Sequence, residues 1–133
     1  MKNIKGKNSI AIVIAMFIII STNLVCKAQV SNFAKAYVDS NTYSYVTSAT
    51  ASSYSTTARV MVTNIFKADG SNSNYKQVYC KVNSGIPVLV TIGSYYKLGV
   101  PSSNRGAGKA ISLYAMGHDP SLDCRVTGIF DAN

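Results

Sequence analysis

Residues 75–83 read YKQVYCKVN, and this stretch decides the fold because its inward and outward side chains alternate strictly. Val78, Cys80 and Val82 fall on one face, while polar, charged and aromatic side chains fall on the other. Such alternation is typical of a β-strand with one buried face. The stretch therefore predicts a strand whose cysteine points into a core.

Four other segments show strand-like alternation: 58–66, 88–98, 109–116 and 124–132. In the first, Val60, Val62 and Phe66 are expected to share one face and Ile65 to lie on the other. In the last, Cys124 is expected on the inner face. Turn signals separate these segments, and connections this short favour antiparallel pairing.

Two further segments leave alternatives open. Residues 42–57 are rich in Ser, Thr and Tyr and predict one or two edge strands, with a flexible stalk as the alternative. Residues 30–38 fit either a short helix or the first strand. The whole pattern predicts an all-β fold, an antiparallel β-sandwich of about six to seven strands with Ig-like architecture. A small closed β-barrel is the alternative.

The first 28 residues resemble a secretory signal peptide in composition. Basic residues precede an apolar run at 10–20, and small residues precede a cut after Ala28. The run is shorter than a membrane-spanning helix needs. We therefore expect residues 29–133 to be a single exported domain with no membrane span after cleavage. The alternative is a membrane anchor through an uncleaved segment or a lipidated Cys26. The Lys, Ile and Asn usage of the leader is Gram-positive-like.

Removal of the leader would lower the net positive charge and the number of cysteines. Nine Lys and Arg and five Asp remain in residues 29–133, scattered singly, which argues against nucleic acid as a partner. Two cysteines remain, Cys80 and Cys124. In an oxidising compartment such a pair predicts a disulfide, here closing a loop of about 45 residues.

Residues able to support catalysis are few. The chain has no Glu and one histidine, His118, which lies beside Asp119 and close to Asp123 in a predicted turn. Asp in such turns favours local backbone hydrogen bonds over acid–base chemistry. Residues 103–110 lack the first Gly and the hydroxyl of a phosphate loop, and 69–80 lack the acidic twelfth residue of a calcium loop. We therefore expect no enzyme activity, cofactor or metal.

Tyrosine is the unusual residue, with nine in the chain. Tyr95, Tyr96 and Lys97 end a predicted strand before a loop that carries Arg105 and Lys109, and these five form the candidate binding surface. Surfaces rich in Tyr, Ser and Asn bind carbohydrate or protein. The sequence thus predicts a secreted, non-catalytic binding module at or near a bacterial cell envelope, with a cell-wall glycan or a surface protein as partner. The alternative is a secreted antagonistic, bacteriocin-like toxin or inhibitor.

Overall fold

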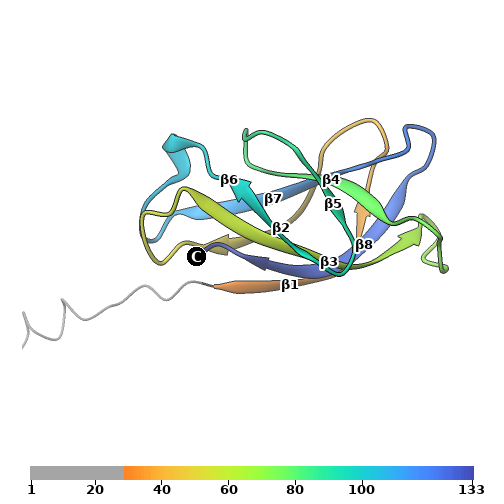
Figure 1. Ribbon diagram of the computed structural model, residues 1–133, viewed down its shortest axis with the longest axis horizontal. Helices are drawn as coiled ribbons and strands as arrows, with labels where there is room; N and C mark the ends of the chain where they lie inside the picture. Colours follow the sequence, from red (N-terminus) through yellow and green to blue (C-terminus); the bar gives the residue numbers. More distant parts are fainter. Residues whose placement is uncertain (1–28) are drawn as a thin grey trace, which may run out of the picture.

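Residues 29–133 form two four-stranded antiparallel sheets in the computed structural model (Figure 1). The predicted signal segment and Cys26 lie outside these described residues. Sheet A has the strand order β1-β8-β3-β6, with bounds Val30–Val38, Cys124–Asp131, Thr57–Lys67 and Tyr95–Gly99. Sheet B has the order β2-β7-β4-β5, with bounds Ser44–Thr50, Ala110–Gly117, Gln77–Val82 and Val88–Thr91. A 3-10 turn, η1 (Ser102–Asn104), lies between β6 and β7.

The predicted antiparallel β-sandwich is confirmed, and the alternative of a closed barrel is wrong because the two sheets remain separate. Along one long side, β1 and β2 approach each other, and the hydroxyls of Ser31 and Thr47 hydrogen-bond at 2.6 Å. Along the other, the turn between β5 and β6 passes from sheet B to sheet A, and the Gly93 amide donates to the Val62 carbonyl at 2.8 Å. Side-chain and turn contacts thus join the sheet edges that strand pairing leaves open.

The core fills the space between the sheets with small and β-branched side chains. β4 and β8 alternate without a break, so Val78, Cys80 and Val82 from one sheet meet Cys124, Val126 and Phe130 from the other. All six are at most 2% exposed. Burial of this apolar surface supplies the main drive for folding, at roughly 25 cal/mol per Å². The inner faces predicted for these two strands are confirmed.

The segment 88–98, predicted as one strand, is two strands in different sheets. The prediction was wrong because apolar alternation continues through Ile92 although the chain turns there. Gly93 has φ of +86°, a backbone conformation that favours glycine, and it allows the turn. This division raises the strand count to eight.

The faces predicted for residues 58–66 hold only as far as Val62. A β-bulge between Val62 and Asn64 shifts the register against β8. As a result Ile65 is buried at 1% exposure and Phe66 faces outward beneath the Lys35 ammonium. The predicted faces of Ile65 and Phe66 were therefore wrong, because one extra residue in a strand reverses the side of every residue after it.

The two ambiguous segments both contribute strands at sheet edges. Residues 30–38 form β1 at the edge of sheet A, and the Ser/Thr-rich segment contributes one edge strand of sheet B, β2. The C-terminus lies beside the start of β1, because Val30 pairs with Asp131 (Figure 1). Within residues 29–133, no helix is long and apolar enough to cross a membrane.

Candidate functional site

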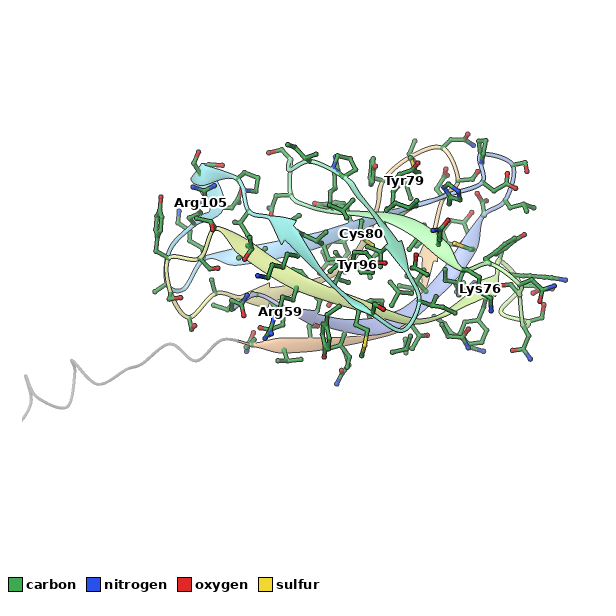
Figure 2. The ribbon with its side chains drawn as sticks, viewed as in Figure 1. Arg59, Lys76, Tyr79, Cys80, Tyr96 and Arg105 are labelled. Carbon is green, nitrogen blue, oxygen red and sulfur yellow. The ribbon has the colours of Figure 1, made fainter. Side chains whose placement is uncertain are left out.

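The outer face of sheet B carries aromatic, aliphatic and amide side chains from all four strands. Tyr79 points outward from β4 because its neighbours Val78 and Cys80 are buried (Figure 2). Outward side chains of the other three strands lie beside it, with a β-bulge between Tyr45 and Thr47 in β2, and form a continuous surface that we call the tyrosine face. Its members are Tyr45, Ser48, Gln77, Tyr79, Lys81, Leu89, Thr91, Ser112, Tyr114 and Met116, flanked by Tyr43 and His118.

Strand pairing sets the aromatic side chains of this face in adjacent rows. Tyr45 lies opposite Tyr114, which lies opposite Lys81 on the next strand. In the neighbouring row, Met116 lies opposite Tyr79. The rings of Tyr45 and Tyr114 meet edge to face, with centroids 6.0 Å apart and planes at 76°. Four strands at a spacing of about 4.8 Å make the face roughly 14 Å wide.

Two side chains from connecting loops extend the face at its rim. The ring of His118 contacts that of Tyr79, with centroids 5.5 Å apart. The Lys81 ammonium lies over the ring of Tyr43, 4.3 Å from its centroid. Burial raises the pKa of the Tyr43 phenol, and the neighbouring Cys80 and Tyr79 raise it further, so this phenol stays neutral at physiological pH. Loop residues therefore contact two outward side chains of β4, Tyr79 and Lys81.

The tyrosine face has little charge and many hydrogen-bonding groups. Lys81 is its one charged member, and that charge is placed over an aromatic ring. The Gln77 amide donates to the Thr91 hydroxyl at 3.1 Å, which leaves the Gln77 carbonyl oxygen available. The phenol of Tyr45 contacts the hydroxyl of Ser48 at 3.2 Å. This combination of flat rings and neutral polar groups suits an uncharged, polyhydroxylated ligand.

The outer face of sheet A has a different chemistry. Its two arginines are engaged within the protein: the Arg59 guanidinium binds the Asp131 carboxylate at 2.5 Å, and Arg125 donates to the Ala68 carbonyl at 2.8 Å. Arg125 also lies over the ring of Tyr37, 5.9 Å from its centroid. Lys97 is also exposed on this face, so it carries more charge than the tyrosine face does.

The five residues of the sequence-predicted surface do not form one site. Tyr95 and Lys97 point outward from β6 on sheet A, whereas Tyr96 between them packs against the core. Arg105 and Lys109 lie in the loop before β7, at the end of the sandwich opposite Lys76 (Figure 2). The Arg105 side chain supports this loop, because its Nε donates to the Val100 carbonyl at 2.8 Å.

Cys80 and Cys124 are both buried, on facing strands of the two sheets, and both are free thiols in this structure. Burial raises the pKa of Cys80 to about 12, and the proximity of Cys124 adds to this. Burial also raises the pKa of Cys124 to about 11. Neutral buried thiols behave as small hydrophobic side chains, and the pairing of these two as a disulfide stays a prediction.

The acidic residues near His118 have structural partners. The Asp119 carboxylate accepts hydrogen bonds from the Ser121 amide at 2.9 Å and from its hydroxyl at 2.7 Å, as expected of a turn aspartate. Asp123 accepts from the Tyr37 phenol and from the Ser40 amide at 2.9 Å. These bonds lower the pKa of both carboxyls. Across residues 29–133, no three His, Cys or acidic side chains gather as metal ligands.

Comparison with known protein families, curated proteins and solved structures finds no match to this chain. The candidate site therefore depends on the geometry of the fold alone. Sequence reasoning found the excess of tyrosine but selected Tyr95 and Tyr96 and missed Tyr45, Tyr79 and Tyr114. The outward position of Tyr79 was readable from alternation in β4, but the rows it forms depend on strand order, which no local pattern encodes.

Proposed function

We propose that this chain is an exported, non-catalytic binding module that holds an extended, uncharged glycan of a bacterial cell envelope along the tyrosine face. The outward tyrosines on three successive strands of sheet B, Tyr45, Tyr114 and Tyr79, are the observation that carries the proposal. A sugar ring presents C–H groups on its faces and hydroxyls around its rim. The face of a tyrosine ring carries negative partial charge and attracts C–H groups, while its phenol can meet a hydroxyl.

The geometry supports a chain-like ligand over a compact one. Rings from β2, β7 and β4 lie on successive strands, so a linear polymer can contact them in turn. Tyrosine also loses little side-chain entropy on binding, because it has two rotatable angles and is held here by its neighbours. The pairing of Tyr45 with Tyr114 supplies such a constraint.

The expectation of a non-catalytic role is supported by the turn positions of the acids near His118. Asp119 accepts hydrogen bonds from Ser121 in its own turn, and Asp123 accepts from Tyr37 and Ser40. An acid–base pair for glycoside hydrolysis needs two carboxyl groups that flank a bound sugar. The expectation of export comes from the leader sequence. For the alternative, an antagonistic toxin, no feature among residues 29–133 gives specific support.

Co-sedimentation of the purified protein with insoluble polysaccharides tests the proposal. We expect retention on cell-wall glycan, and Tyr79→Ala or Tyr114→Ala should weaken it about 5–30-fold, which corresponds to about 1–2 kcal/mol for an aromatic contact. Tyr95→Ala is the matched control, since it removes an exposed tyrosine, 56% exposed, from the other sheet. Failure of every polysaccharide to retain the protein, or an equal loss with Tyr95→Ala, would refute the proposal.

A further inference from the structure

A pocket of about 190 Å³ opens at the end of the sandwich next to the tyrosine face. It lies where the start of β4 and the end of β7 separate from the start of β8, and its wall is mainly apolar. Pockets that hold whole drug-sized ligands occupy about 300–1,000 Å³, so this one fits a single small group or one sugar unit.

The pocket is continuous with the tyrosine face through two shared residues. His118 lines the pocket, and its ring contacts Tyr79 on the face. Gln77 also lines the pocket, while its amide nitrogen hydrogen-bonds to Thr91 on the face. A ligand lying across β4 can therefore reach the pocket without leaving the protein surface.

The floor and the rim of the pocket differ in polarity. The floor consists of the buried Cys124 and the half-buried ring of Tyr75, and Gly117 and Leu122, which is 39% exposed, also line the pocket. The thiol of Cys124 has its pKa raised by burial to about 11, so it is uncharged at neutral pH. An uncharged floor of this kind favours a methyl group over a hydroxyl.

The rim offers both donors and acceptors. Asn74, Lys76 and His118 are exposed, and within the described part of the chain none of their side chains has a hydrogen-bond or ion-pair partner. Asp119 uses Oδ1 to bind Ser121, which leaves Oδ2 available. A carboxamide, an ammonium, an imidazole and a carboxylate oxygen around one opening can together bind an amide or a pair of hydroxyls.

We infer that this pocket recognises the 2-acetamido group of an N-acetylated sugar, with the acetyl methyl on the floor and its amide at the rim. The inference rests on the proposed function and names the class of sugar in the glycan that the tyrosine face binds. The pocket confers specificity, whereas the tyrosine face supplies contact that does not depend on the substituent. Asn74 is the residue best suited to bind the amide, because a carboxamide can donate and accept at once.

Calorimetry with two trisaccharides of the same β-1,4 backbone tests this inference, with chitotriose carrying acetamido groups where cellotriose carries hydroxyls. We expect chitotriose to bind at least tenfold more tightly. Asn74→Ala should reduce that preference about fivefold or more, and Leu122→Trp, which fills the pocket, should abolish it. Asn72→Ala is the matched control, because Asn72 is an exposed residue of the same loop that does not line the pocket.

The outcomes separate the two proposals. Equal affinity for the two trisaccharides, or a preference that survives both Asn74→Ala and Leu122→Trp, would overturn the pocket assignment and leave glycan binding intact. A protein that binds neither trisaccharide nor any insoluble polysaccharide would overturn both. Chemical shifts of the Leu122 methyl groups give an independent readout, and they should move with chitotriose and stay unchanged with cellotriose.

Discussion

Substitution of Gly128 by alanine tests the packing between the two central strands of sheet A and the core. Gly128 points inward from β8 and pairs with Val62 of β3 and Phe33 of β1. An added Cβ would overlap the carbonyl oxygen of Met61 and would lie 2.6 Å from Cζ of Phe33. The Met61 carbonyl belongs to the backbone of a paired strand and cannot rotate away, so either the strands or the Phe33 ring must move.

This geometry sets the loss of stability expected for Gly128→Ala. Overpacking of a core costs about 1–3 kcal/mol, and the backbone clash places Gly128→Ala at the upper end, about 3 kcal/mol. The entropy that alanine removes from the unfolded chain offsets only about 0.4–1 kcal/mol. In a domain of this size the net loss should lower the melting temperature by roughly 10–20 °C. Urea unfolding followed by tyrosine fluorescence and circular dichroism measures it.

Two further variants check the cause. Gly99→Ala, also in a strand of sheet A, places its Cβ where no atom lies within 4 Å, so stability should stay within about 0.5 kcal/mol of the original or rise slightly. Adding Phe33→Leu to Gly128→Ala should recover part of the loss through a coupling of about 0.5–2 kcal/mol, but not all of it, because the Met61 carbonyl remains. A Gly128→Ala protein within about 1 kcal/mol of the original would refute this account of the core.

Three other measurements address the thiols and one carboxyl. In reduced, folded protein at pH 8, burial keeps the thiols of Cys80 and Cys124 protonated, so mass spectrometry should show that they are alkylated far more slowly than in urea. Cys124, which lines the pocket, should be modified before Cys80. The reverse order would contradict the burial described. In secreted protein, the predicted disulfide should appear as a mass lower by two hydrogens, and its reduction should lower the free energy of unfolding by about 4 kcal/mol for a loop of about 45 residues; two alkylatable thiols in that material would show the pairing to be wrong. The hydrogen bond from the Tyr37 phenol lowers the pKa of Asp123, so the stability that this bond contributes is complete above the unfolded pKa of about 3.9 and is lost as pH falls through the lower folded value. Asp123→Asn should therefore make stability depend less on pH over that range. An unchanged pH dependence would contradict the Tyr37–Asp123 hydrogen bond.

Strict alternation made some strands predictable from sequence. In β4 and β8 every second side chain is buried, and the inner faces read from the sequence are those in the structure. The same method failed where the backbone departs from regular pairing. The bulge after Val62 exchanges the faces of Ile65 and Phe66, and the turn at Gly93 divides one apparent strand into two. The bulge arises from pairing with a neighbouring strand, which the local sequence does not specify, whereas Gly93 is a local turn signal within a continuing apolar alternation.

The candidate site was less predictable than the fold for a related reason. Composition indicated that tyrosine matters, but the tyrosine face joins Tyr45, Tyr79 and Tyr114 from strands separated by up to 69 positions in the chain. Their proximity requires β7 to lie between β2 and β4, a strand order fixed by the packing of the whole domain. The adjacent pair Tyr95 and Tyr96 looked more conspicuous in the sequence, yet strand alternation sends these two side chains to opposite sides of sheet A.

Alternation also places core side chains next to side chains of the tyrosine face within single strands. In β4, Cys80 is buried toward sheet A, while Tyr79 and Lys81 on either side of it belong to the tyrosine face. Substitutions at the two outward positions remove little core contact, and changes at such surface positions usually alter stability by no more than about 0.5 kcal/mol. A loss of glycan retention in Tyr79→Ala can then be assigned to the binding face whenever its unfolding curve matches that of the original protein. A substitution at Cys80 gives no such separation, because it disturbs the core directly beneath that face.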